Sequence, residues 1–503
     1  MSTIRKQSLI SSAIVYFGFV LGMVNVWLFT RVGGFTKEQF GVTATFLAFS
    51  SVLFSLSSMG SLTYVTKFFP YYNANLNRKD NDQFTWALLV PVVGFGIVTL
   101  AGLMFKGVFV RVFNNSPQLI RYYYWLYPFS FGYTVFMVLE GFAWFHGKSV
   151  LTNFFKEVLF RLLLTVLIVL TTWKIIPSFD QFVRCYAFLY GILALLLGGV
   201  LWRRGVVHFR FSPSKVTRRL RKRIIALVSF SWGSSFLMNL AQVIDTIIIA
   251  AILPNGVAMA GLYSLGATLS GFIQAPQRAV VSAAVSHLSE AWRAKDEGRI
   301  RRIYQRSAIN QLIFATAMFC LIWLNFRDAL TTFNIQSDFL VSSWVFFYMG
   351  LRCVVDMGTG VSSQIIATST YWRFEFTTGL LLVALSIPLN VLLTMRLGIY
   401  GPALSSLLSY IVYNTIRYFF LWRRFRMQPF SAATVYTLLL SGGVYAVCYL
   451  AFRHFSGFWA MTARSSAFLV LFAAGALLLR LSPDVAPVWQ TVKKRLGLAP
   501  RGA

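Results

Sequence analysis

Apolar runs long enough to cross a lipid bilayer fill almost the whole of this chain. A helix that crosses the hydrocarbon needs about 20 mostly apolar residues. With 57% hydrophobic and 12% charged residues, the composition also lies outside the range of soluble domains. The sequence therefore predicts an all-α integral membrane protein with about fourteen transmembrane helices. They lie near residues 9–30, 40–63, 84–105, 121–145, 151–173, 182–202, 224–252, 259–285, 308–326, 340–366, 374–395, 399–421, 431–452 and 461–479.

The positive charges lie mostly on one side of these predicted spans. If the N-terminus is cytoplasmic, the inside segments hold 31 of the 46 Lys and Arg residues, the outside segments hold nine, and six fall within spans. This distribution follows the positive-inside rule, so we expect both termini to be cytoplasmic. The net charge of +31 is then explained by topology and by contact with anionic membrane lipids, and no nucleic-acid partner is needed.

Two segments that lie 220 residues apart share a pattern. In "NVWLFTRVGGFTKEQFGVTATFL" and "DTIIIAAILPNGVAMAGLYSLGA", a polar residue inside a span is followed by a Gly/Pro turn and by a glycine, Gly41 or Gly261, that opens the next helix. Parallel repeats with a substrate path between the halves are a transporter architecture. We therefore expect the following domains: an N-lobe with spans 1–6 at 1–203, a basic cytoplasmic linker at 204–223, a C-lobe with spans 7–12 at 224–425, and two further spans with a basic cytoplasmic tail at 426–503.

Three stretches resemble a known family. "TRVGGFTKEQFG" looks like the ARxLGxxxFG element that ends the first span in oligosaccharide-lipid flippases of the MOP superfamily. "VIDTIIIAAILPNGVAMAGLYSLG" resembles the hairpin between spans seven and eight of that family, and "MRLGIYGPALSSLLSYIVYNTIRYFFLWRRFRMQPF" is similar to its twelfth span with a basic end. The chain departs from the family pattern at Gly33-Gly34, where Leu-Gly is usual, and at "SFSWG", which replaces a common proline.

The resemblance implies a V-shaped transporter of the MOP/MATE type in the O-antigen flippase branch, located in a bacterial cytoplasmic (inner) membrane. The implied substrate is a polyprenyl-diphosphate-linked oligosaccharide used in polysaccharide or lipopolysaccharide assembly. Polymerases and glycosyltransferases of the same pathway are the implied protein partners. Two C-terminal spans beyond twelve favour this branch over the drug exporters of the superfamily.

Charged residues inside the spans are the candidates for function, because each is costly in hydrocarbon and such residues usually face a bundle interior or a wet cavity. Arg278 follows "FIQAPQ" and has no acid within four residues on its own helix. A guanidinium can grip phosphate oxygens with two parallel hydrogen bonds. The residues that we expect to bind the phosphates and sugars of the substrate are Arg278, Arg352, Arg31 and Arg161.

Two alternatives without a role in substrate binding stay open for these arginines. Arg352 and Asp356 are four residues apart, so they share a helix face and can form a structural ion pair. Glu157 and Arg161 have the same spacing near a span end, where the long arginine side chain can instead extend to the interface.

Three acids are candidates for coupling transport to H⁺ or Na⁺: Asp245, Glu140 and Asp356. For Asp245 the structural alternative is a hydrogen bond to Asn239, Gln242 or a neighbouring helix. No HExxH, GxSxG or Walker-type pattern occurs, so neither a catalytic site, a metal site, a cofactor nor ATP use is expected. A secondary transporter rather than an enzyme is therefore predicted.

Two other functions remain to be weighed. One is a cation-coupled multidrug exporter of the same superfamily, in which Asp245 and Glu140 would carry the coupling. The other is an integral membrane glycosyltransferase or polymerase. That class usually has a large extramembrane loop with catalytic acids, whereas the predicted outside loops here are short and contain few acids.

Overall fold

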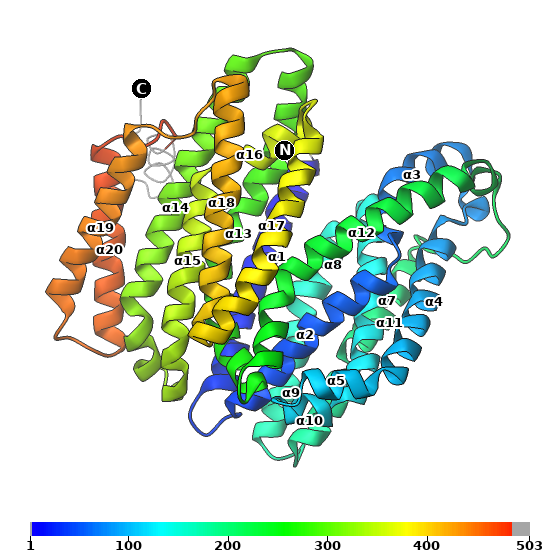
Figure 1. The fold of residues 1–503 in the computed structure, drawn as a ribbon, viewed down its shortest axis with the longest axis horizontal. Helices are drawn as coiled ribbons and strands as arrows, with labels where there is room; N and C mark the ends of the chain where they lie inside the picture. Colours follow the sequence, from blue (N-terminus) through cyan, green and yellow to red (C-terminus); the bar gives the residue numbers. More distant parts are fainter. Residues whose placement is uncertain (1–2, 485–503) are drawn as a thin grey trace. The chain divides into compact units, whose positions relative to one another are not determined.

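The computed structural model describes residues 3–484. Long helices joined by short connections make up this part of the chain, as the apolar runs predict (Figure 1). Most of the predicted basic tail, with its last four cations, lies outside the described residues. Contacts divide the chain into two compact units, 1–261 and 262–503.

Among the described residues, the first unit contains twelve complete α-helices and the start of a thirteenth. Their bounds are α1 (Thr3–Thr30), α2 (Lys37–Ser57), α3 (Ser61–Asn75), α4 (Gln83–Met104), α5 (Lys106–Val112), α6 (Pro117–Arg121), α7 (Leu126–Phe145), α8 (Ser149–Asn153), α9 (Phe160–Thr172), α10 (Phe179–Ala187), α11 (Leu189–Arg203) and α12 (Lys215–Ile252). Helix α12, which begins within the predicted linker, packs on α2 and α3. Contact-based units and repeat-based lobes therefore differ, and the lobe boundaries stay a prediction.

The second unit is built from the next eight helices, the first of which begins in the first unit. Their bounds are α13 (Gly256–Arg293), α14 (Glu297–Thr332), α15 (Ser342–Gly358), α16 (Ser362–Thr368), α17 (Trp372–Leu397), α18 (Tyr400–Phe425), α19 (Ala432–Phe452) and α20 (Phe458–Leu478). The last two lie side by side against α14 (Figure 1). An apolar cluster that includes Leu324, Cys448 and Phe468 holds this pair in place.

Eleven helices of the described chain are long and apolar enough to cross a membrane. The three other predicted spans are present as helices. Of these, α7 and α18 are long enough to cross a membrane but are less apolar than the eleven. The span at 151–173 is interrupted by a π-helical segment, η3 (Phe154–Leu159), between α8 and α9. The all-α membrane fold is confirmed, and the count of fourteen spans stays a prediction.

The turn between α1 and α2 shows why the sequence places two glycines there. Gly33 adopts a φ of 76°, in the left-handed region that other residues disfavour. The Thr36 hydroxyl then accepts from the backbone N–H of Gln39, whose side chain accepts from the backbone N–H of Thr36, and this capping box starts α2. The hairpin therefore reverses within a few residues.

Candidate functional site

In the second unit, the side chain of Arg352 is half-buried and forms no ion pair with a carboxylate of the described residues. One guanidinium nitrogen, Nη2, donates to the Oε1 oxygen of Gln274 on α13 over 3.2 Å. The guanidinium carbon lies 4.7 Å from the centre of the Tyr410 ring on α18, a cation–π contact. The buried Nε of Arg352 has no hydrogen-bond partner among the described residues, so the arginine keeps a donor that a ligand could use.

Asp356 is held by neutral amides. The side-chain nitrogen of Gln277 donates to Oδ2 over 2.9 Å, and that of Asn414 donates to Oδ1 over 3.4 Å. Although Arg352 lies four residues before Asp356, the described side chains form no ion pair between them. The structural ion pair that the spacing allows is therefore not formed, because amides of α13 and α18 take its place.

The charged side chains of Glu375 and Arg417 form an ion pair that the sequence analysis did not single out. Glu375 lies in the first turn of α17, and Arg417 lies on α18 with only 3% of its side chain exposed. The Arg417 Nε is 3.2 Å from Oε2 of Glu375, and Tyr413 and Ser363 donate to Oε1. The only sequence signal was a charge in each of two apolar runs, 42 residues apart.

Asn414 joins these groups into one network. Its oxygen accepts from Arg417 Nη1 over 3.3 Å and from the hydroxyl of Thr359 over 2.9 Å, while its nitrogen donates to Asp356. Polar side chains therefore connect α13, α15, α17 and α18 inside the second unit. Such a network fixes the relative positions of these helices, since each unmade bond within the membrane is costly.

Arg278 is exposed, whereas Arg352 and Arg161 are only partly accessible. It has no ion-pair partner among the residues that the structure describes. Gln274, which binds Arg352, lies four residues earlier and so on the same face of α13, about one turn away. Arg278 therefore lies about one turn along α13 from Gln274, the residue through which Arg352 of α15 contacts this helix.

In the first unit, Glu140 is almost completely buried on α7 and binds Lys156. The Lys156 nitrogen lies 3.0 Å from Oε2 and 3.3 Å from Oε1 of Glu140. The sequence analysis did not single out Lys156. The π-helical segment η3 carries it and turns it towards α7, which the sequence pattern does not reveal.

Arg161 pairs with Glu157 across one helical turn, with 2.9 Å between Nη2 and Oε2. Both side chains are largely buried, so this arginine does not extend to the interface. Its backbone oxygen accepts from the side-chain nitrogen of Asn25 on α1, and its guanidinium carbon lies 5.4 Å from the centre of the Phe19 ring. Arg161 Nη1 is buried without a hydrogen-bond partner.

The remaining predicted residues are Asp245 on α12 and Arg31 after α1. Asp245 is half-buried on α12, and Asn239, one of its expected partners, exchanges hydrogen bonds with Ser51 and Ser55 of α2. Arg31 directly follows α1, with its guanidinium carbon 5.4 Å from the centre of the Trp27 ring. No group of three or more His, Cys, Asp or Glu that could hold a metal occurs within the searched, described residues.

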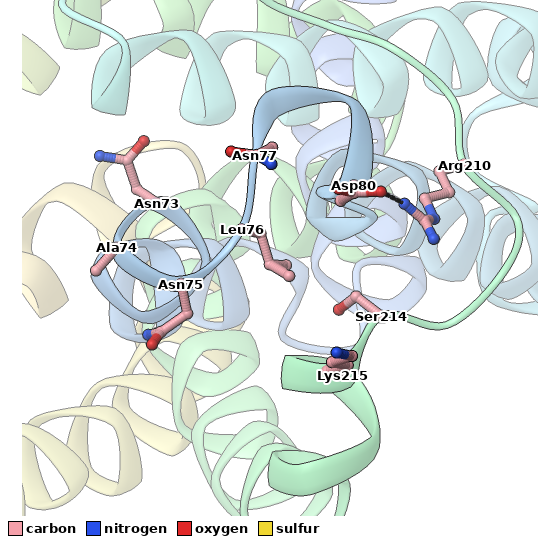
Figure 2. Close-up of a pocket in the computed structure, with 9 residues that line it drawn as sticks. All are labelled: Asn73, Ala74, Asn75, Leu76, Asn77, Asp80, Arg210, Ser214 and Lys215. Atoms are coloured by element: carbon pink, nitrogen blue, oxygen red, sulfur yellow. Dashed lines mark hydrogen bonds and ion pairs between the residues drawn. The ribbon is translucent and has the colours of Figure 1, made fainter.

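A polar cavity of about 540 Å³ lies beside the connection between α3 and α4 (Figure 2). Asp80 at its wall is paired with Arg210 of the linker. The other lining residues are mostly small or polar: Asn73, Ala74, Asn75, Leu76, Asn77, Ser214 and Lys215. The ion pair with Asp80 therefore holds the linker against the connection between α3 and α4.

The buried carboxylate of Asp82 fixes the linker further. Its Oδ2 accepts from the backbone N–H of Ser214 over 2.9 Å, from the Thr217 hydroxyl over 2.7 Å and from Trp86 Nε1 over 3.0 Å. The hydroxyl of Tyr72 lies 2.6 Å from that of Thr217, and burial raises the pKa of the Tyr72 phenol above its usual value. These bonds join the start of α4 to the first turn of α12.

No protein-family model matches this sequence, and no curated protein matches it significantly. Several solved structures share its fold. The lipid II flippase MurJ, in an inward closed conformation, aligns with 94% of this chain and 99% of its own at a TM-score of 0.71 and 14% identity. The MATE transporter VcmN of Vibrio cholerae aligns with 84% of this chain and 98% of its own, at a TM-score of 0.56 and 13% identity.

A MATE transporter in complex with MaL6 covers 84% of this chain and 96% of its own, with a TM-score of 0.56 and 14% identity. At these identities the likeness shows the fold. The chain is a multi-pass membrane protein with the fold of these transporters, as the sequence resemblance predicted. The O-antigen branch stays a prediction.

Proposed function

We propose that this protein is a flippase that moves a polyprenyl-diphosphate-linked oligosaccharide across the bacterial cytoplasmic membrane by alternating access, for polysaccharide, O-antigen or lipopolysaccharide assembly. One observation carries the proposal. Arg278 lies one turn after Gln274 on α13, Gln274 binds Arg352 of α15, and neither arginine is paired with a carboxylate in the described structure. Two unpaired guanidinium groups within apolar spans suit a substrate that brings two phosphates.

The remaining donors of these two arginines fit that role. Arg352 is held from two sides, by Gln274 and by the Tyr410 ring, so its guanidinium is oriented before any ligand arrives. Its buried Nε would gain a partner when a phosphate oxygen binds. Arg278 is exposed and so can reach a ligand without breaking an ion pair. A site that is oriented in advance loses less entropy on binding.

Arg161 and Arg31 are weaker candidates for contacts to the sugars or phosphates. Arg161 is already neutralised by Glu157, so a phosphate would have to compete with that carboxylate. Its unpartnered Nη1 nevertheless leaves one donor for a ligand. Arg31 lies at the end of the first helix, next to an aromatic ring.

Among the acids, Asp356 is the best candidate for binding H⁺ or Na⁺. Neutral amides hold it, whereas Glu140 is already compensated by Lys156. A carboxylate without a cationic partner gains most from taking up a cation inside the membrane. Asp245 stays a second candidate on α12.

The extent of the fold match also supports a lipid-linked substrate over a drug. The lipid II flippase covers 94% of this chain, whereas the two MATE structures cover 84%. The pair α19 and α20 is the part of the chain that sequence analysis placed beyond twelve spans. The two termini are proposed to be cytoplasmic on the positive-inside count.

The test is a gene deletion in the native host. Surface polysaccharide is quantified, and the leaflet that holds the lipid-linked precursor is probed with a membrane-impermeant sugar-modifying reagent. The proposal predicts less surface glycan and precursor trapped in the inner leaflet. A normal precursor distribution with altered drug tolerance would instead favour the cation-coupled exporter, and accumulation of unpolymerised precursor in the outer leaflet would favour a polymerase or glycosyltransferase.

A further inference from the structure

The first unit contains a second cavity that none of the transport residues lines. It measures about 680 Å³ and lies between α3, α4 and the first third of α12. This volume is within the range of about 300–1,000 Å³ that small-molecule sites occupy. Apolar side chains make up most of its wall, including Val90 of α4 and Ile224, Ile225 and Val228 of α12.

Two arginines, Arg218 and Arg221, lie at one end of this cavity. Both are exposed, and neither has an ion-pair partner among the residues described. Along α12 the lining residues recur every three or four positions, so the cations and the apolar groups share one helix face. Along the sequence of α12, Arg218 and Arg221 precede the apolar lining residues.

The position of this face relative to the membrane decides what it can bind. Helix α12 has 38 residues and is therefore about 57 Å long, whereas the hydrocarbon is about 30 Å thick. The apolar run of the predicted span begins at 224, and the basic residues precede it. On the predicted orientation, Arg218 and Arg221 lie at the level of the lipid phosphates in the inner leaflet.

Aromatic residues at the same level agree with this placement. Tyr64 and Trp86 line the cavity, and such rings prefer the interface between lipid and water. The polar cavity of Figure 2 lies next to the same turn of α12, through Ser214 and Lys215. A ligand here would therefore meet cations, then interfacial rings, then apolar side chains.

We propose that this cavity binds an anionic phospholipid of the inner leaflet, with its phosphate on Arg218 and Arg221 and an acyl chain along Val90, Ile225 and Val228. The order of charge and apolarity along α12 matches that of a phospholipid entering from the membrane. None of the arginines proposed to bind the transported substrate lines this cavity. The inference rests on the predicted orientation but does not depend on the proposed function.

The test uses the full-length protein purified in detergent, with bound lipids counted by native mass spectrometry. Phosphatidylglycerol is titrated against phosphatidylcholine with the same acyl chains, and the wild type should retain the anionic lipid preferentially. Each interfacial arginine contributes about fivefold to anionic-lipid affinity, so the R218Q/R221Q variant should bind phosphatidylglycerol about 30-fold more weakly.

The matched control is R219Q/R223Q, which removes the same charge from adjacent positions of α12 that do not line the cavity. It should lose clearly less affinity than R218Q/R221Q, because its arginines attract the lipid only from outside the cavity. A second variant, Ser229→Trp, should block the apolar part of the cavity and lower binding while both arginines remain. Thermal stability of each variant is measured alongside, so that misfolded protein is recognised.

Three results would overturn the proposal. Equal losses in the two double variants would mean diffuse attraction rather than a site. Equal retention of phosphatidylcholine would remove the preference for an anionic lipid. Displacement of phosphatidylglycerol by a polyprenyl diphosphate that binds more tightly, and that is lost in R218Q/R221Q, would assign the cavity to the transported substrate.

Discussion

Gly41 and Gly261 meet backbone to backbone where α2 passes the start of α13. A Cβ added to Gly261 would lie 3.1 Å from the Cα of Gly41 and 2.4 Å from the carbonyl oxygen of Lys37. A Cβ added to Gly41 would lie 1.8 Å from the carbonyl oxygen of Val257. These are the two glycines that the sequence repeat aligns.

The first prediction concerns this contact. Gly41→Ala should lower the midpoint of thermal unfolding in detergent, because backbone rather than a flexible side chain blocks the added methyl group. Overpacking of this kind costs about 1–3 kcal/mol. The control is Gly96→Ala on α4, where an added Cβ meets nothing within 4 Å. Equal stability of the two variants would show that the close approach is not maintained in the protein.

The sequence repeat singled out Gly41 and Gly261 but did not show that their backbones meet. Apolar length and the distribution of Lys and Arg are local properties, so the helices and the expected topology could be predicted from them. Which charges meet depends on how helices rotate and pack. Sequence alone therefore missed the partnership of Glu375 with Arg417, and it left open a pairing of Arg352 with Asp356 that does not form.

Local irregularity set a second limit on what the sequence could predict. The run at 151–173 appears as one continuous apolar helix in the sequence, yet η3 interrupts it. A π-helical turn widens the helix and changes the direction of every side chain after it, and such turns are frequent at functional sites. The contact of Lys156 with Glu140 depends on that segment, so residue spacing alone could not identify Lys156 as the partner of Glu140.

The second prediction tests the phosphate contact. Arg278→Ala should abolish complementation of a deletion strain while protein abundance in the membrane stays unchanged, because the exposed side chain supports no ion pair in the described structure. Arg278→Lys should retain partial function, since an ammonium keeps the charge but not the planar pair of donors. Export of surface glycan is the readout, and immunoblotting of membranes reports abundance. Normal export by the alanine variant would remove Arg278 from the proposed site.

The third prediction compares the energetic coupling within two charge pairs, one that forms an ion pair in the structure and one that only the sequence spacing suggests. Double-mutant cycles with glutamine substitutions compare Glu375 and Arg417 with Arg352 and Asp356. The first cycle should give a coupling energy above about 1 kcal/mol, because the two groups are 3.2 Å apart and poorly exposed. Removing Arg417 alone should cost about 3–5 kcal/mol, since it leaves a buried carboxylate uncompensated.

The second cycle should be nearly additive, within about 0.5 kcal/mol, because Arg352 and Asp356 each bind amides on other helices. Unfolding in mixed micelles by titration with a denaturing detergent gives the free energies for both cycles. A larger coupling in the second cycle than in the first would contradict the network described here.

The fourth prediction concerns the linker, which the buried carboxylate of Asp82 holds through Ser214 and Thr217. Asp82→Ala removes every one of these bonds, and one hydrogen bond to a charged group is worth about 1.5–3 kcal/mol. Local opening of the linker should therefore become easier, and trypsin should cut after Arg210 about tenfold faster or more. The measurement is a time course of limited proteolysis on inverted membrane vesicles.

Asp80→Ala provides the control for this experiment, because it breaks only the partly exposed pair of Asp80 with Arg210. Surface ion pairs contribute little to stability, so its cleavage rate should change only slightly. If Asp82→Ala were cut no faster than Asp80→Ala, the buried carboxylate would not be what holds the linker. Cleavage in right-side-out vesicles instead of inverted ones would reverse the predicted topology, because the linker would then face outwards.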